Sequence, residues 1–229
     1  MSTALITGAS RGIGREVART LAAEEWRVIS AVRDPRSAPP GTQAETVDMG
    51  IPASIDLLTE RLRARGEQLD ALINNAAIYR GPSDEIWNVN VRGPLLLTRA
   101  LEGLLKENAR VIMVTSGLGQ LSGQPASLVK RLTDSNLSMR DIETLIEEAP
   151  GGYGASKAAL NAMTRLFATE LKPRRILVNA ISPGWCRTDM GGRSAPRSAE
   201  QGAASILWGV HLPPDGATGG VFEDGRRFA

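Results

Sequence analysis

The stretch Thr7-Gly8-Ala9-Ser10-Arg11-Gly12-Ile13-Gly14 follows a short apolar run at residues 4–6 and opens a segment in which Ile13, Val17 and Leu21 recur every four residues. A strand, a glycine-rich turn and a helix in this order let the backbone approach a pyrophosphate, whose charge the helix N-terminus favours. An ordinary tight turn is the alternative. The stretch predicts a dinucleotide site that includes Gly8, Ser10, Arg11, Gly12, Ile13 and Gly14.

Further apolar runs bounded by turn signals predict buried strands at residues 28–32, 69–73, 111–114 and 176–181. Helical patterns lie between them: Ile55, Leu58 and Leu62 recur at three and four positions, and a helix is expected from near Pro94 towards Lys106. Residues 33–46, rich in proline, are expected to form a loop. Alternating strands and helices predict an α/β fold: a doubly wound parallel sheet in three α/β/α layers, the Rossmann fold.

Composition limits the possible functions. The 229 residues, 42% of them hydrophobic, are enough for one domain that spans residues 1–229. The 27 basic and 25 acidic residues are spread out, which argues against nucleic-acid or membrane partners. One cysteine and one histidine leave no disulfide framework and no metal site. No apolar stretch approaches the roughly 20 residues of a membrane span, so a cytoplasmic location is expected.

Two segments interrupt the alternation. Residues 118–150 read as an insertion, in which Ser138-Met139-Arg140-Asp141 has the form of a capping box and is followed by Ile142, Leu145 and Ile146 at helical spacing. A small amphipathic helix is expected there. Residues 184–196, rich in glycine and proline, have the composition of a mobile substrate loop over a cleft.

The second predicted strand ends at Val32-Arg33-Asp34, where this fold presents a side chain to the adenosine ribose. An arginine there favours a 2′-phosphate, whereas an acid favours a 2′-hydroxyl. Arg33, with Arg11 reaching from the glycine turn, predicts that NADP(H) is preferred over NAD(H). Asp34, one position further along, could instead bind the 2′-hydroxyl. Either arginine could also simply be solvated.

Tyr153 and Lys157 stand four residues apart in Tyr153-Gly154-Ala155-Ser156-Lys157. On a helix this spacing places both side chains on one face, where a positive charge favours the phenolate. The pair predicts a proton donor with a lowered pKa, as carbonyl reduction requires.

With these features, the chain resembles the short-chain dehydrogenase/reductase family over nearly its whole length. The resemblance rests on several motifs in the family's order: the glycine turn, Asn74-Asn75-Ala76-Ala77, Asn90 in Asn88-Val89-Asn90-Val91, Ser116, Tyr153 with Lys157, and Pro183-Gly184 leading to Thr188.

The resemblance implies a role for each matched residue. Tyr153 is the general acid or base, Lys157 assists it and holds the nicotinamide ribose, Ser116 orients the substrate carbonyl, and Asn90 supports a water chain to Lys157. Taken singly, each residue also has an ordinary structural explanation. These are helix packing for Tyr153, a solvated side chain for Lys157, a turn hydroxyl for Ser116 and a helix cap for Asn90. Further cofactor contacts are implied for Asp48, Asn74, Ala76, Pro183, Gly184 and Thr188.

The separation of Ser116 and Tyr153 departs from the commonest family pattern, in which about a dozen residues lie between them. The extended segment, Pro183-Gly184-Trp185-Cys186-Arg187-Thr188-Asp189-Met190 and the ending Gly219-Gly220-Val221-Phe222-Glu223-Asp224-Gly225 look most like the carbonyl reductase branch. That branch implies NADPH, quinone, ketone or aldehyde substrates, and often a monomer. A monomer is favoured and a homo-oligomer is possible. Cys186 reads as an inert small residue, with reactivity left open.

The leading hypothesis is an NADPH-dependent carbonyl reductase. One alternative is an alcohol dehydrogenase that oxidises a secondary hydroxyl of a steroid, sugar or acyl chain, because the same acid and base serve both directions. Another is a catalytically silent dinucleotide-sensing regulator, since fold alone does not establish turnover.

Overall fold

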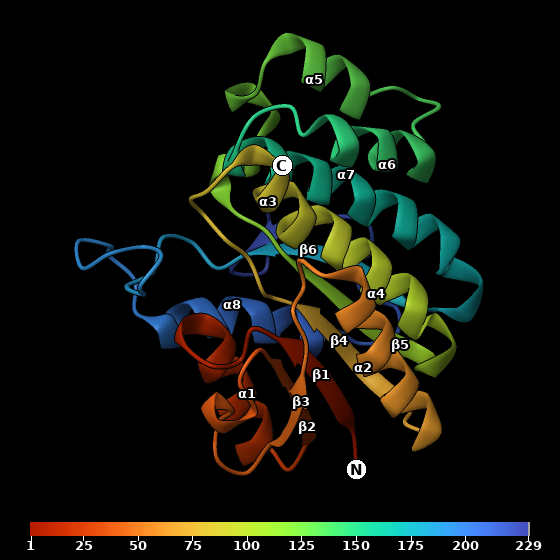
Figure 1. Ribbon diagram of the computed structural model, residues 1–229, viewed down its shortest axis with the longest axis vertical. Coiled ribbons are helices and arrows are strands. Elements are labelled where there is room, and N and C mark those ends of the chain that lie inside the picture. Colours follow the sequence, from red (N-terminus) through yellow and green to blue (C-terminus); the bar gives the residue numbers. More distant parts are fainter. Residues whose placement is uncertain (229) are drawn as a thin grey trace.

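The computed structural model describes residues 1–228 and contains one eight-stranded sheet (Figure 1). The strand order is β3-β2-β1-β4-β5-β6-β7-β8, and all neighbours are parallel except β7 and β8. The strands are β1 Thr3–Thr7, β2 Arg27–Val32, β3 Gln43–Thr46, β4 Leu69–Asn74, β5 Leu105–Val114, β6 Leu177–Ser182, β7 Val221–Glu223 and β8 Arg226–Arg227. The order confirms the predicted doubly wound sheet.

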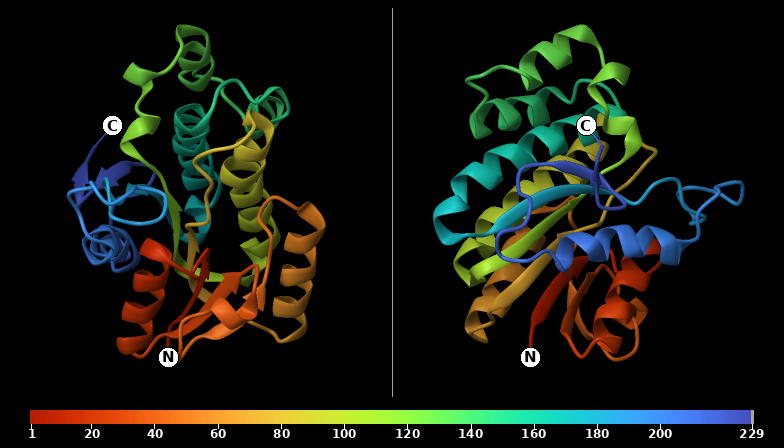
Figure 2. Two further views of the ribbon diagram at one scale, coloured as in Figure 1. Left: turned by 60° about the vertical axis from the view of Figure 1, so that its left-hand side comes forward. Right: turned by 180° about the vertical axis from the view of Figure 1, so that it is seen from behind.

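Helices cover both faces of the sheet, and the left view of Figure 2 shows the three layers. Helices α1 Gly12–Ala23 and α8 Ala199–Val210 pack together on one face, over a core that includes Val17, Leu21 and Ile206. On the other face, a larger core joins α2 Pro52–Ala64, α4 Gly93–Leu101 and α7 Tyr153–Glu170. Burial of strands on both faces explains why they read as continuous apolar runs.

The order of the strands reverses between β1 and β4, which lie side by side although β2 and β3 separate them in the chain. At such a switch point the loops that leave neighbouring strands diverge, and a crevice opens outside the carboxyl ends. The glycine turn leaves β1 and the asparagine motif leaves β4 at this position. The fold therefore places both motifs at one edge of the sheet.

The segment between β5 and α7 contains two helices, α5 Ala126–Leu132 and α6 Met139–Glu148. Both pack against α7, and they form the upper end of the molecule in Figure 1. The predicted capping box is present: Ser138 accepts from the Asp141 backbone N–H, and Asp141 accepts from the Ser138 backbone N–H. The expected amphipathic helix is therefore α6, with Ile142, Leu145 and Ile146 buried.

Several elements differ from the expectations. Strand β3 lies inside the predicted 33–46 loop, because its short run Gln43–Thr46 pairs with β2 despite a mostly polar sequence. Helix α4 ends at Leu101, and β5 begins at Leu105, before the predicted helix end at Lys106. Helices α5 and α8 and strands β7 and β8 were not predicted. For α8 a signal existed, since Ser198 and Gln201 form a second capping box.

Asn90 lies in an irregular part of a long helical run. This run comprises α3 Ser83–Trp87, the π-helical turn Asn88–Arg92, α4 and the 3₁₀ turn Glu102–Leu104. A π turn widens the helix by one residue and is frequent at functional sites. Here it carries Asn90, which is completely buried.

Within residues 1–228, no helix combines the length and the apolar character needed to cross a bilayer.

Candidate active site

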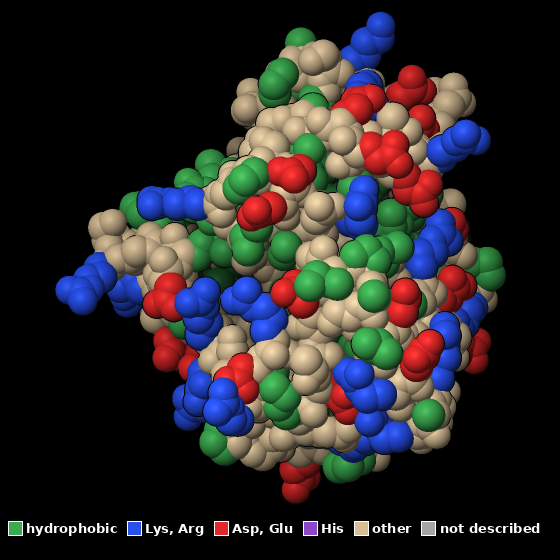
Figure 3. Space-filling model, viewed as in Figure 1, with side chains coloured by type: hydrophobic (Ala, Val, Ile, Leu, Met, Phe, Trp, Pro, Cys, Tyr) green, Lys and Arg blue, Asp and Glu red, His purple; other side chains and the backbone are tan. Residues whose placement is uncertain are grey.

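A cleft of about 480 Å³ opens at the carboxyl edge of the sheet. Figure 3 shows a hollow beside the loop that follows β6, with apolar side chains in it and Lys and Arg side chains along its lower rim. Thirteen predicted site residues line the cleft: Gly8, Ser10, Arg11, Gly12, Ile13, Gly14, Arg33, Asp48, Ala76, Tyr153, Lys157, Pro183 and Thr188. The structure thus brings together residues from six separate segments of the chain.

The three glycines of the turn occupy positions where a side chain would be strained or would clash. Gly8 and Gly12 have φ values of +70° and +55°, which L side chains rarely adopt. A Cβ on Gly14 would lie 2.4 Å from the Asn75 Nδ2 and 2.5 Å from the Gly8 carbonyl oxygen. Helix α1 begins at Gly12, and no side chain caps its N-terminus. The turn therefore offers free backbone N–H groups at a helix N-terminus, which suits a pyrophosphate.

The predicted adenosine end of the cleft contains Arg33 but not Asp34. Both carboxylate oxygens of Asp34 accept hydrogen bonds from Arg36, at 2.9 and 3.0 Å, and this partner lowers the pKa of the Asp34 carboxyl. Asp34 is thus paired with Arg36 and does not line the cleft. Arg11 also lines the cleft, paired at 2.8 Å with Asp189, which belongs to the loop after β6.

The structure corrects the prediction for Asn74. This side chain is buried between β4, α4 and β5, where its amide donates to the Thr98 Oγ1 at 3.2 Å, and it does not line the cleft. Asn75 lies there instead, and its amide donates to the Thr7 carbonyl at 2.8 Å. Alternation along an extended chain explains the exchange, because successive side chains point to opposite sides.

Asn90 ties the loop after β4 to α7. Its Oδ1 accepts from the Ile78 N–H at 2.9 Å, and its Nδ2 donates to the Ile78 carbonyl at 2.9 Å and to the Ser156 Oγ at 3.1 Å. Ser156 in turn donates to the Tyr153 carbonyl at 2.7 Å. Asn90 does not line the cleft, so it supports the site from behind. The water chain implied for it stays a prediction.

Tyr153 and Lys157 occupy the first two turns of α7, on one face as their spacing predicted. The Lys157 Nζ lies 5.5 Å from the centre of the Tyr153 ring and donates to the Val114 carbonyl at 2.7 Å. The lysine is only 2% exposed, and burial lowers its pKa to about 7. Burial also raises the pKa of Tyr153 to about 12, a direction that the nearby Ser116 hydroxyl opposes.

These pKa values correct one expectation. The sequence predicted that Lys157 would lower the pKa of Tyr153, whereas burial raises it and the opposing contribution comes from the Ser116 hydroxyl. Near neutral pH the phenol keeps its proton, while the buried ammonium is close to losing its own. A protonated phenol beside the cleft is suited to donate a proton to a developing alkoxide.

Ser116 and Gly184 do not line the cleft itself. Ser116 caps the short turn after β5, where its Oγ accepts from the Leu118 N–H at 3.3 Å. Gly184 has a packing role, because a Cβ there would lie 2.7 Å from the Arg197 Cδ. Its φ of +72° also favours glycine.

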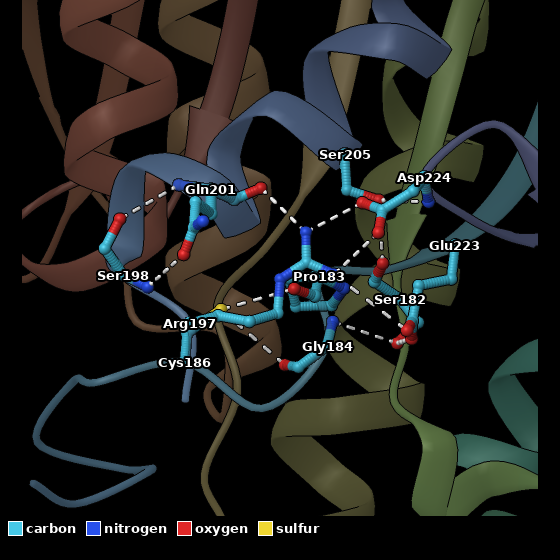
Figure 4. Close-up of polar contacts among 10 residues, drawn as sticks. All are labelled: Ser182, Pro183, Gly184, Cys186, Arg197, Ser198, Gln201, Ser205, Glu223 and Asp224. Atoms are coloured by element: carbon cyan, nitrogen blue, oxygen red, sulfur yellow. Dashed lines mark hydrogen bonds and ion pairs between the residues drawn. The ribbon is translucent and has the colours of Figure 1, made fainter. Parts of the chain in front are cut away.

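Arg197 holds the base of the loop after β6 (Figure 4). Its guanidinium donates to both carboxylate oxygens of Asp224, at 2.7 and 2.8 Å, and to the Gln201 carbonyl at 3.1 Å. The Arg187 N–H donates to the Arg197 carbonyl at 2.8 Å, which closes the loop at its two ends. Cys186 is buried there, and burial raises the pKa of its thiol, as an inert residue requires.

Sequence reasoning missed Arg187, Asp189 and Met190 as lining residues of this cleft. All three fall in the predicted substrate loop, and Arg187 donates to the Ala195 and Pro196 carbonyls. The family resemblance assigns roles in this region only to Pro183, Gly184 and Thr188, so no motif pointed to the other three residues. Among residues 1–228, no three His, Cys, Asp or Glu side chains lie together as a metal ion would need.

A doubly wound sheet, a glycine turn at the switch point and a tyrosine with a lysine four residues on define an NAD(P)-dependent oxidoreductase. The family described as short chain dehydrogenase matches residues 2–128, and the one described as enoyl-(acyl carrier protein) reductase matches residues 136–210. The chain belongs to the short-chain dehydrogenase/reductase family, close to its carbonyl reductase branch.

Individual relatives agree with this assignment. The NADPH carbonyl reductase 3 of Rattus norvegicus is 31% identical, over 93% of this chain and 91% of the relative. The NADPH-bound carbonyl reductase from chicken fatty liver superposes with a TM-score of 0.79 at 26% identity, over 100% of this chain and 99% of the other. Salutaridine reductase from Papaver somniferum has a TM-score of 0.85 at 23% identity, over 98% and 100%, and shows the same fold.

Proposed function

We propose that this protein is an NADPH-dependent carbonyl reductase that acts on ketones, aldehydes or quinones. The observation that carries the proposal is that Tyr153 lines the same cleft as the glycine turn, with the Lys157 Nζ 5.5 Å from the centre of its ring. The names of the carbonyl reductase relatives support the same activity. We take residues 1–229 as one domain, in which the 118–150 segment and the 184–196 loop shape the substrate side.

Bound NADPH supplies a hydride to the carbonyl carbon, and the glycine turn, Arg33 and Lys157 are the residues that would hold it. Tyr153 donates its phenolic proton to the carbonyl oxygen as negative charge develops there. Ser116, beside Tyr153, orients that oxygen by a hydrogen bond. Lys157 then returns a proton towards Tyr153, which its pKa of about 7 makes possible near neutral pH.

Arg33 and Arg11 support NADP(H) over NAD(H). Both line the cleft, whereas Asp34 is engaged by Arg36. An arginine binds a 2′-phosphate through charge-assisted hydrogen bonds, which are about twice as strong as neutral ones. The pair of Arg11 with Asp189 is an exposed ion pair of small net stability, so a phosphate can compete for the guanidinium.

The packing of α5 and α6 on α7 supports a monomer. Leu128, Leu132 and Leu145 are buried in this contact. A helix face that is already covered within the chain is not free for a second copy. A mass of two or four chains in light scattering would contradict this part of the proposal.

The activity is tested by following NADPH oxidation with a panel of quinones, diketones, aldehydes and ketoesters, with NADH in parallel. Wild-type turnover that disappears in Tyr153→Phe supports the reductase. Tight NADPH binding with no turnover on any carbonyl would support the sensor hypothesis. Faster oxidation of secondary alcohols with NADP⁺ than reduction of any carbonyl would support the dehydrogenase hypothesis.

A further inference from the structure

Tyr79 is an aromatic residue beside the reaction centre to which the proposed mechanism gives no role. Its ring lies 4.9 Å from that of Tyr153, centre to centre, at an interplanar angle of 77°. In spite of this contact, Tyr79 is 41% exposed. One part of the ring therefore packs on the proton donor and another faces outward, free to meet a ligand.

The position of Tyr79 is fixed by its neighbour. Both backbone polar groups of Ile78 are bonded to the side chain of Asn90, which is buried and also bonded to Ser156 of α7. Asn90 thus links the segment that carries Tyr79 to the helix that carries Tyr153. Such a clamp holds the two rings in a defined relation, and an ordered ring costs little entropy when it binds a ligand.

Other exposed apolar side chains surround the same edge of the sheet. Tyr79 follows β4, Leu118 follows β5, and Trp185 and Met190 follow β6, and these three strands are neighbours. Leu118 is 56% exposed, Trp185 57% and Met190 44%. Of these residues, Met190 also lines the cleft. Exposed apolar side chains at the edge of a cleft are typical of a ligand site.

We propose that Tyr79 is a specificity-determining residue whose aromatic ring selects carbonyl groups attached to flat aromatic systems. This inference rests on the proposed reductase function and names the substrate class for it. An aromatic ring prefers another ring to a saturated one of similar size, because ring quadrupoles favour offset or edge contacts. Such a contact corresponds to a preference of about two- to tenfold.

The test compares two diketones that differ only in the ring, 1-phenyl-1,2-propanedione and 1-cyclohexyl-1,2-propanedione, with NADPH as the reductant. The quantity measured is the ratio of their kcat/KM values for wild type and three variants. Tyr79→Phe keeps the ring and removes the hydroxyl, and Tyr79→Leu removes the ring and keeps an apolar side chain. Leu57→Ala, on α2, is the matched control, since Leu57 is a comparably exposed apolar residue at 56%.

The phenyl-to-cyclohexyl ratio is expected to be the same in wild type, Tyr79→Phe and Leu57→Ala, and about two- to tenfold lower in Tyr79→Leu. An unchanged ratio in Tyr79→Leu overturns the inference. Thermal unfolding of each variant checks the fold.

A binding experiment separates failure of this inference from failure of the proposed function. In the presence of NADPH, calorimetry compares 2-naphthol with its saturated counterpart decahydro-2-naphthol. If wild type reduces neither these diketones nor any carbonyl of the panel, the reductase proposal fails, and this comparison still decides the role of Tyr79. Tighter binding of 2-naphthol that is lost in Tyr79→Leu supports the inference, and equal binding of the two alcohols overturns it.

Discussion

The nucleotide side of the cleft and its substrate side are built by different means. The nucleotide side uses backbone: glycines with positive φ, the bare N-terminus of α1, and Gly14, at which an added Cβ would lie 2.4 Å from the Asn75 amide. The substrate side uses side chains on long loops, held by Arg197 and Asp224 and lined by exposed apolar groups. The nucleotide side is therefore specified by a short motif, whereas the substrate side can vary without changing the fold.

The largest effect is expected on the nucleotide side, from the addition of a single methyl group at Gly14. Gly14→Ala places a methyl group against the Asn75 amide and the Gly8 carbonyl, which must both move. We expect a destabilisation of about 1–3 kcal/mol and at least about a tenfold loss of NADPH affinity. Chemical denaturation and calorimetry measure the two effects. Gly103→Ala is the matched control, because nothing lies within 4 Å of its added Cβ; equal effects of both variants would contradict the account.

Arg33→Ala sharpens the comparison by testing a side chain on the nucleotide side. Loss of a charged hydrogen bond to a 2′-phosphate costs about 1.5–3 kcal/mol, so NADPH affinity should fall about 10- to 100-fold while NADH affinity changes little. Arg36→Ala is the control, since Arg36 pairs with Asp34 outside the cleft. A parallel loss of NADH affinity in Arg33→Ala would show that the arginine does not read the phosphate.

Lys157 lies between the two sides, and its burial gives a pH dependence of stability. Its pKa is lowered from 10.5 to about 7 in the folded chain, so between these values the unfolded chain binds a proton that the folded chain does not. Stability of the protein without cofactor should therefore rise as the pH increases from about 7 towards 10.5.

Lys157→Met should remove most of this rise, and the measurement is urea denaturation at several pH values in that window. Lys172→Met, at an exposed lysine, is the control and should keep it. The same dependence of stability on pH in wild type and Lys157→Met would contradict the lowered pKa of Lys157.

Asp224→Asn, on the substrate side, should have the smallest effect. Its pair with Arg197 is partly exposed, at 54% and 22% for the two side chains, and such a pair contributes about 0.2–1 kcal/mol. We expect a small loss of stability and faster proteolysis within residues 184–196. Glu107→Gln, which breaks the exposed pair with Arg175, should leave that proteolysis unchanged. Equal proteolysis of all three proteins would show that Arg197 does not hold the loop.

The sequence predicted the parts of the structure that depend on local pattern. The strands β1, β2, β4 and β6 are apolar and buried on both faces, so their runs stand out from the chain. The capping box of α6 was also visible, because the residues that cap a helix are adjacent in sequence. Most of the thirteen cleft residues were predictable because family motifs fix their positions, and Arg33 was predictable because it follows the second strand.

The remainder depends on tertiary contacts that no short pattern reveals. Strand β3 is mostly polar, and it exists because β2 offers a partner. The exchange of Asn74 for Asn75 depends on which way one side chain points, and the raised pKa of Tyr153 depends on burial by residues far away in sequence. Tyr79 gave no signal either, since its contact with Tyr153 joins two segments that are far apart in sequence.

The central claim is that the cleft transfers a hydride from NADPH to a carbonyl carbon while Tyr153 supplies the proton. The most direct measurement is mass spectrometry of the alcohol formed from 1-phenyl-1,2-propanedione with NADPH deuterated at C4, prepared as each of its two stereoisomers. The account predicts one deuterium on the carbinol carbon from one stereoisomer only, and no product from Tyr153→Phe. Product without deuterium from either stereoisomer, or unchanged product formation by Tyr153→Phe, would contradict it.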